Sequence, residues 1–449
     1  MDLIPKPGQL AAASGNVAHK LLYGGLADLR TMPRTLIDEG NLREVYHYRP
    51  SGKVKESGDP VLLVTPLAAP SLCFDLRRGC SLVEHLVTEG RRTYLVEYGE
   101  VSFKDRNLGM EHWVREVLPE AIRATSEHAG GRPVHVVGWS LGGIFGLLTT
   151  AALGDRLPIA TLTMVGSPID VKQVPLVAPI QPLLGVVGGS KYSIVSAAYR
   201  AMGGAPKPLV KKAFQFSAIN KMVTKPFVKL AKLDDTEFLA QIEAVDRFTQ
   251  NMIAYPGRTF GQLYHRMVRT NQLATGVIKY EDYTVKLANV HVPVLAFGGL
   301  ADGIAPISCV RPVVDLLTGS PEVRWEEVPG GHLGMLTGRA ARRTTWTIMD
   351  EWLDQHSSTA APAKPATKAP AKKAAAAKKV APTKKAAPAK EAAAEKKPVK
   401  RAAAKKAKPS VTSQIVSGDV PDAPPADGPA IGSNPSRRYG SSASRSLGR

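Results

Sequence analysis

The stretch PVHVVGWSLGGIFGLL, residues 133–148, changes its character at its centre. An apolar segment typical of a buried strand precedes Ser140, and an apolar segment of helical length follows it. Gly138 stands two residues before this serine and Gly142 two residues after it. Small residues at these places let a strand turn sharply into a helix, so that the serine hydroxyl stands clear of its own backbone. The stretch predicts a strand–turn–helix unit with Ser140 as the nucleophile; the alternative is a serine that only caps the helix.

The sequence on both sides repeats this alternation of strand and helix. Strands are expected at 44–49 (an edge strand), 60–67, 92–98, 133–139, 159–167, 292–299 and 323–330, and helices at 80–90, 108–131, 141–153, about 306–317 and about 338–355. Continuous apolar strands that alternate with helices indicate a parallel sheet covered on both faces. The predicted fold class is therefore α/β, with a mostly parallel, doubly wound sheet.

The alternation pauses after Pro168 and resumes near residue 289. Residues 169–288 are mostly helical in pattern and lack clear strands, so we expect a cap that is inserted into the core. The core is assigned to 41–168 and 289–356, after a lead-in of residues 1–40. The apolar loop 174–189 and the lysine-rich segment 209–233 are candidates for an acyl tunnel or a lipid contact; the alternative is that they are the cap's own core and solvated face.

The C-terminal segment 357–449 differs sharply from the rest in composition. Between Lys364 and Lys408 there are 16 basic and 2 acidic residues, set among alanine and proline. Such a segment cannot bury a core, and we expect a disordered basic tail. Residues 364–408 are expected to bind DNA without sequence specificity, or an anionic membrane or lipid granule surface. A solvated spacer is the alternative.

Two later loops offer partners for the serine hydroxyl, which needs a base and a group that orients the base. Asp302 follows the expected strand 292–299, and His332 lies in a glycine loop after strand 323–330. The order Ser, Asp, His along the chain is the order expected for this kind of site. The alternatives are an aspartate that only forms a turn and a histidine that only stabilises its loop.

An acyl-transfer site also needs N–H donors for the oxyanion that develops during the reaction. The backbone N–H of Leu141 is one candidate, since it directly follows the serine. Leu67 or Ala68, in the loop TPLAAP after strand 60–67, is the other. Pro66 and Pro70 are excluded because proline has no N–H.

The composition excludes several classes of protein. The three cysteines, Cys73, Cys80 and Cys309, have no metal-ligand spacing and do not form a disulfide framework. The N-terminus has no apolar region of the secretory type, and the longest apolar run is broken by prolines, so a cytoplasmic protein is expected, associated with granules or the nucleoid if the tail binds there. No cofactor is expected beyond an acyl-CoA substrate.

Five segments together resemble the polyhydroxyalkanoate synthases, within the α/β-hydrolase fold. They are PVLLVTPLAAPSLCFDLRRGCSLVEHLVTEGRRTYLVEY (60–98), HVVGWSLGG (135–143), LYHRMVRTNQLATG (263–276), LANVHVPVLAFGGLADGIAP (287–306) and VPGGHLGMLTGRAARRTTWTIMDEWL (328–353). The resemblance covers about residues 55–355. Synthases of this family transfer a hydroxyacyl group from coenzyme A to a growing polyester, and Ser140, Asp302 and His332 occupy the places of nucleophile, acid and base.

The chain departs from this family at the nucleophile, where the synthases carry cysteine and this chain has Ser140. Lys286 also stands where the synthases usually carry an acidic residue. A serine acyl-enzyme is an oxygen ester, whose usual fates are hydrolysis or transfer to an alcohol. We therefore expect acyl transfer on lipid acyl esters or (hydroxy)acyl-CoA, by a synthase-like acyltransferase or an esterase, lipase or thioesterase. The competing hypothesis is a weakly active or inactive interaction protein, tethered to granules or DNA by its tail.

Overall fold

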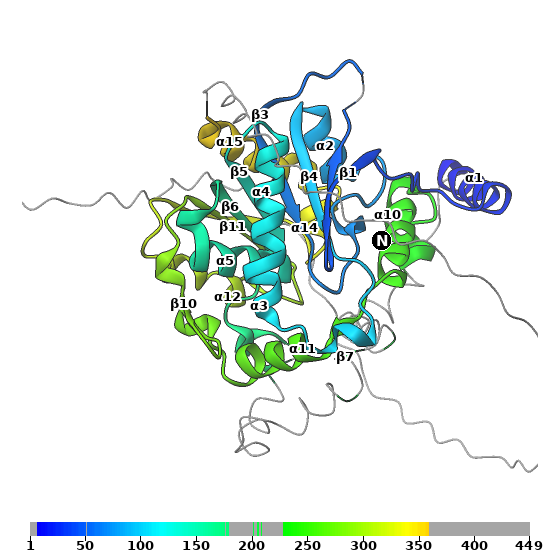
Figure 1. Ribbon diagram of the computed structural model, residues 1–449. Helices are drawn as coiled ribbons and strands as arrows, with labels where there is room; N and C mark the ends of the chain where they lie inside the picture. Colours follow the sequence, from blue (N-terminus) through cyan, green and yellow to red (C-terminus); the bar gives the residue numbers. More distant parts are fainter. Residues whose placement is uncertain are drawn as a thin grey trace, which may run out of the picture. The chain divides into compact units, whose positions relative to one another are not determined.

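An eight-stranded sheet forms the centre of the protein (Figure 1). The computed structural model describes residues 7–50, 52–175 and 228–358, and in addition residues 177, 178, 201, 204, 205 and 208. The strand order is β1-β2-β4-β3-β5-β6-β11-β12. The bounds are β1 Arg34–Gly40, β2 Arg43–Tyr48, β3 Ser57–Val64, β4 Arg91–Glu97, β5 Val134–Trp139, β6 Ile159–Val165, β11 Val294–Gly299 and β12 Val323–Val328. All pairs from β4 to β12 are parallel, and β1 and β2 pair antiparallel at one end.

Helices cover both faces of this sheet because its central strands are apolar on both sides. In β3, Leu62 and Val64 pack into one core cluster and Val61 and Leu63 into another. Side chains alternate between the faces of a strand, so the two clusters lie on opposite faces. The first cluster contains side chains of α4 (Leu118–His128) and α5 (Leu141–Leu153), and the second those of α2 (Leu82–Thr88) and α15 (Thr345–His356). The predicted doubly wound α/β fold is confirmed.

Some of the remaining helices lie outside the helix ranges that the sequence predicts. The remaining helices are α1 Pro7–Tyr23, α3 Met110–His112, α10 Thr236–Gln250, α11 Gly257–Leu263, α12 Ile307–Val310, α13 Val313–Leu316 and α14 Gly334–Thr337. The helix expected at 306–317 is split into α12 and α13 around Pro312, which fits poorly inside a helix. In the described part of the chain, no helix combines the length and the hydropathy that a membrane crossing requires.

Two strand predictions need correction. The segment at 44–49 is not the edge of the sheet, because β1 pairs with β2 on its outer side and provides the edge. Since β1 starts at Arg34, the core that we propose starts there and not at residue 41. Strand β3 ends at Val64 rather than at residue 67, so residues 65–67 belong to the loop that follows it.

The predicted insertion divides into parts of different character. Met267, Leu273, Ile278 and Leu287 are buried in the same core cluster as the helices α4 and α5, so the end of this region packs on the core. Short strands also occur there, contrary to expectation: β7 Gly204–Ala205, β8 Tyr255–Pro256, β9 Val277–Lys279 and β10 Thr284–Lys286. Most of the candidate lipid segments 174–189 and 209–233, and the tail beyond Ser358, lie outside the described residues.

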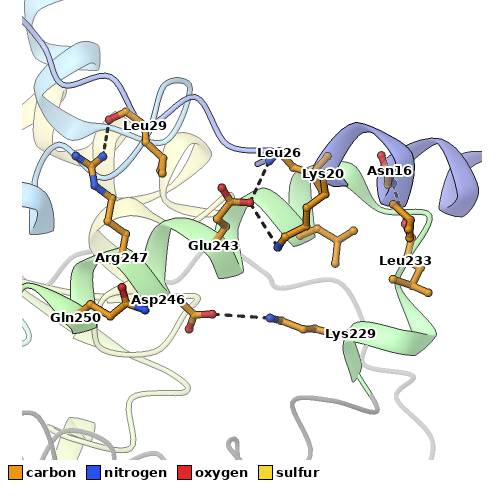
Figure 2. Close-up of a pocket in the computed structure, with 12 residues that line it drawn as sticks. Asn16, Lys20, Leu26, Leu29, Lys229, Leu233, Glu243, Asp246, Arg247 and Gln250 are labelled. Atoms are coloured by element: carbon orange, nitrogen blue, oxygen red, sulfur yellow. Dashed lines mark hydrogen bonds and ion pairs between the residues drawn. The ribbon is translucent and has the colours of Figure 1, made fainter. Parts of the chain in front are cut away.

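Helix α10 has an outer face that packs against α1 and the segment after it (Figure 2). A cavity of about 330 Å³ lies between them, with Leu29, Leu233 and Leu239 among its apolar lining residues. Glu243 accepts the backbone N–H of Leu26 at 3.0 Å, and the Arg247 guanidinium donates to the Leu29 carbonyl. Because Ala244 and Phe248 of α10 are buried in the core, the cavity lies on the opposite side of this helix.

Candidate active site

The turn between β5 and α5 presents Ser140 in a strained backbone conformation. Its φ is 53° and its ψ is −122°, a combination that non-glycine residues rarely adopt and that costs about 1–3 kcal/mol. A Cβ on Gly138 would lie 2.5 Å from the backbone of Gly143, and a Cβ on Gly142 would collide with the end of β3. The glycines therefore permit the sharp turn that the sequence predicts. The Ser140 N–H donates to the Val165 carbonyl at 2.8 Å and fixes the turn on β6.

The structure brings the three predicted side chains into one hydrogen-bonded chain. His332 Nε2 lies 2.9 Å from Ser140 Oγ, and His332 Nδ1 lies 2.7 Å from Asp302 Oδ2. Since the aspartate oxygen accepts a hydrogen bond, Nδ1 carries the proton and the Nε2 lone pair faces the serine hydroxyl. This is the tautomer that a base for the serine requires.

The carboxylate of Asp302 is fixed by its own loop. Its Oδ1 accepts the backbone N–H groups of Ile304 at 2.8 Å and Ala305 at 2.9 Å, which leaves Oδ2 for the histidine. The side chain of Asp302 is fully buried and that of His332 is 6% exposed. The buried carboxylate is therefore held on three N–H donors, and it orients the imidazole ring.

The candidate oxyanion donors lie at the carboxyl ends of two adjacent strands. Leu141 follows β5, and Leu67 and Ala68 follow β3, which pairs with β5 in parallel. Within the described part of the chain, no backbone carbonyl accepts from the N–H of any of these three residues, whereas the Ala69 N–H donates to Pro66. The role of oxyanion donor for these N–H groups remains our proposal.

None of the three cysteines is placed to act as the nucleophile. All three are buried. Burial raises the pKa of the Cys73 thiol well above its ordinary value and that of Cys309 to about 12. The Arg342 guanidinium donates to Cys80 Sγ at 2.9 Å. Ser140 is therefore the nucleophile candidate that the geometry supports.

Asn271, which lies in a segment that resembles the synthases, and Lys286, which departs from them, take structural or peripheral places. Asn271 has a φ of 48°; its Oδ1 accepts the Val171 N–H at 3.0 Å and its Nδ2 donates to Asp170 at 2.8 Å. It ties the segment after α11 to the loop that follows β6. Lys286 ends β10 and is exposed.

Trp139, the residue before the serine, has a contact that the sequence analysis missed. Its indole Nε1–H donates to the backbone carbonyl of His332 at 3.0 Å. A tryptophan beside the nucleophile is the one signal in the sequence that suggests such a contact, since a buried indole N–H needs a partner.

The chain is similar to several curated proteins of one kind. It is 22% identical over 331 residues to the poly(3-hydroxyalkanoate) polymerase subunit PhaC of Haloferax mediterranei, which covers 73% of this chain and 65% of that protein. The subunit of the same name from Allochromatium vinosum is 23% identical over 343 residues, which covers 76% of this chain and 94% of that protein. The chain therefore spans slightly less than two thirds of the Haloferax relative. No family model matches the chain.

Among solved structures, the alpha/beta hydrolase domain-containing protein 10 from mouse is similar over 72% of this chain and 99% of that one, with 14% identity and a TM-score of 0.41. An esterase from Thermogutta terrifontis is similar over 72% and 99%, with 14% identity and a TM-score of 0.39.

The fold, the turn and the sequence similarity agree with one another. A mostly parallel sheet carries a serine on a strained strand-to-helix turn, and the later strands carry an aspartate and a histidine in that order. The similarity to the two PhaC subunits covers 73% and 76% of the chain. The chain is similar in sequence to poly(3-hydroxyalkanoate) polymerase subunits, and its sheet and strand-to-helix turn are those of the α/β-hydrolase fold.

Proposed function

We propose that the protein transfers acyl groups from lipid acyl esters or (hydroxy)acyl-CoA through an acyl-Ser140 intermediate. The observation that carries the proposal is the hydrogen-bonded chain from Ser140 through His332 to Asp302. A serine hydroxyl needs such a base to become a nucleophile at neutral pH. The turn supports the same role, since strain of this kind is found where a functional side chain must be presented.

The first half of the reaction forms the acyl-enzyme. As Ser140 Oγ bonds to the acyl carbonyl carbon, its proton moves to His332 Nε2, and Asp302 stabilises the resulting imidazolium. The carbonyl oxygen becomes an oxyanion, for which we propose the N–H of Leu141 and that of Leu67 or Ala68 as donors. The bond to the thiol or alcohol then breaks, and His332 returns the proton to this leaving group.

The second half of the reaction depends on the acceptor. Water or an alcohol gives its proton to His332 and attacks the ester, which releases an acid or a new ester and restores Ser140. An alcohol can also attack a cysteine thioester, as a polymerising enzyme requires, but the oxygen ester of Ser140 is the less activated of the two. We therefore propose hydrolysis, or transfer of one acyl group, ahead of polymerisation.

Hydroxyacyl substrates are proposed from the relatives, whose name denotes a polymerase subunit for poly(3-hydroxyalkanoate). The expected substrate is an acyl or 3-hydroxyacyl thioester or ester.

The composition of the tail supports a second candidate function, binding of polyanions. Residues 364–408 carry 16 basic and 2 acidic groups. We propose that this segment binds DNA or an anionic lipid surface by releasing counterions, which can coexist with catalysis. An affinity for double-stranded DNA that does not fall steeply between 50 and 300 mM salt would contradict this proposal.

The acyl-transfer proposal is tested with p-nitrophenyl esters and acyl-CoA of several chain lengths. Wild type and Ser140→Ala are compared for release of p-nitrophenol or free coenzyme A, and the acyl products are separated by chromatography. We expect turnover that depends on Ser140, with free acid or a single ester as the product. Equal turnover by both proteins, or none by wild type with any donor, would refute the proposal.

A further inference from the structure

Trp139 connects the nucleophile turn with the loop of the candidate base. It is the last residue of β5 and is 2% exposed. Its indole N–H donates to the His332 carbonyl at 3.0 Å, and the centroids of the indole and imidazole rings are 5.1 Å apart. The adjacent residue is Ser140, so a closed circuit runs from Ser140 through its peptide bond to Trp139, on to His332, and back to Ser140 Oγ.

The His332 loop has little regular structure of its own, and apart from the indole it is held by the N–H groups of Ala301 and Met335, which donate to the Gly330 and Gly331 carbonyls at 3.0 and 2.9 Å. The loop enters through Gly330, with a φ of 120°, and Gly331, and the short helix α14 begins only at Gly334. Within the described residues, the indole is the one donor to the His332 carbonyl. If that bond is lost, the glycines allow the imidazole to leave the line between Ser140 and Asp302.

Helix α10 holds the indole from its other side. Phe248 meets Trp139 edge to face, with centroids 6.0 Å apart and planes inclined at 63°. The same helix contacts the histidine segment, since Gln241 Nε2 donates to the Thr337 carbonyl at 3.2 Å. Just beyond it, the Ile253 N–H donates to the Ala68 carbonyl at 2.8 Å. Helix α10 and the residues that follow it thus contact both sides of the candidate site.

We propose that Trp139 is a positioning residue that keeps His332 aligned on Ser140, and that α10 holds its indole through Phe248. This inference rests on the proposed function, because it assigns the alignment of the base in that reaction.

The test measures the reactivity of Ser140 without a natural substrate. A p-nitrophenyl alkylphosphonate reacts once: Ser140 Oγ bonds to phosphorus, the serine proton passes to His332, and p-nitrophenolate leaves. The full-length chain is treated with increasing reagent, and the maximal labelling rate and half-saturating concentration are read from p-nitrophenolate release. Intact mass confirms a single adduct, and Ser140→Ala defines the background.

Two tryptophan variants form a matched pair. Trp139→Phe keeps an aromatic ring against Phe248 and removes only the indole donor. Trp346→Phe removes a similar bond, from Trp346 Nε1 to the Leu336 carbonyl at 2.8 Å, which does not involve His332. Both lose one buried bond and are expected to have similarly lowered Tm values. Phe248→Leu is the third variant, and it should show a smaller effect than Trp139→Phe.

We expect Trp139→Phe to lower the maximal labelling rate about ten- to a hundredfold and to leave the half-saturating concentration within about twofold, since misplacing a reacting group acts on the rate. Trp346→Phe should label as wild type does. Equal labelling rates for the two variants would overturn the role of Trp139 while the proposed function stands. A Trp139→Phe chain that does not fold would also overturn it, because the role would then be structural. Failure of wild type to label at Ser140 would overturn the proposed function and this inference with it.

Discussion

Substitution of Gly142 by alanine tests the close packing behind the serine. A Cβ at this position would lie 3.0 Å from the carbonyl carbon and oxygen of Thr65 and closer still to the Val64 carbonyl oxygen. These are backbone atoms at the end of β3, which cannot swing aside as the tip of a side chain can. Forcing one methyl group into such a place costs about 3 kcal/mol, the upper part of the usual range for overpacking.

The same collision is expected to impair catalysis. Relief requires β3 and the loop after it to move away from α5, and that loop contains the proposed donors Leu67 and Ala68. Loss of one oxyanion donor lowers kcat about 10²–10³-fold. The Gly142→Ala variant should therefore lose about 6–12 °C in Tm, at about 2–4 °C per kcal/mol, together with about a hundredfold in kcat.

Gly146→Ala is the matched control on the same helix. Its Cβ would meet the side-chain ends of Leu162 at 3.2 Å and Val136 at 3.6 Å, which can yield, and alanine favours a helix over glycine by about 1 kcal/mol. We expect this variant to retain its Tm and its activity within about twofold. Thermal unfolding and ester turnover are measured on both. If Gly142→Ala were as stable and active as Gly146→Ala, the close-packed turn would not be what positions the site.

Three further predictions concern the hydrogen bond between Asp302 and His332, a buried histidine and a buried ion pair. Asp302→Asn should lower kcat about 10³–10⁴-fold at unchanged Tm, because an amide no longer fixes the His332 tautomer. If ester turnover decreased by less than about tenfold, Asp302 would not have the orienting role. Burial lowers the pKa of His135 to about 4. In the unfolded chain this histidine takes up a proton as the pH falls below about 6.5, whereas in the folded chain it stays neutral until about pH 4. The free energy of unfolding therefore decreases between about pH 6.5 and 4. From pH 7 to 4.5 this amounts to about 2 kcal/mol in urea unfolding, and His135→Gln should lose that share of the pH dependence. Arg132 donates at 2.8 Å to Asp59, whose side chain is fully buried. Arg132→Ala should lower the free energy of unfolding by about 3 kcal/mol, and the additional substitution Asp59→Asn should restore part of this loss. No recovery in the double variant would mean that the loss is not electrostatic.

The fold could be predicted from the sequence where a single physical signal dominates. Helix α5 spans Leu141–Leu153 as expected, since the turn fixes its start and a continuous apolar run fixes its length. Strand β1 was missed because its sequence, RTLIDEG, is polar and its residues are partly exposed at the edge of the sheet. The short strands β9 and β10 are three residues long; β10 packs on α5 and β9 pairs with β10, and the local pattern encodes neither contact.

The residues of the candidate site and their order along the chain could be predicted from the sequence, but the contacts that surround them could not. The order of Ser140, Asp302 and His332, each in a loop after a strand, indicated that they meet at one edge of the sheet, and the structure brings them together. The link from Trp139 to His332 joins residues 193 positions apart and depends on the side-chain direction at the end of β5. The bond from Ile253 to Ala68 involves only backbone atoms, so no pattern of side chains could have indicated it.

The most direct test of the central claim is the mass of the protein after brief reaction with an acyl donor. Wild type is mixed with a 3-hydroxyacyl-CoA, quenched in acid within milliseconds to seconds, and analysed as the intact chain and as peptides. We expect one acyl group on the peptide that contains Ser140, present before free acid or ester accumulates and absent from Ser140→Ala. Product formation with no adduct on Ser140, or with the acyl group on Cys73, Cys80 or Cys309, would contradict the claim.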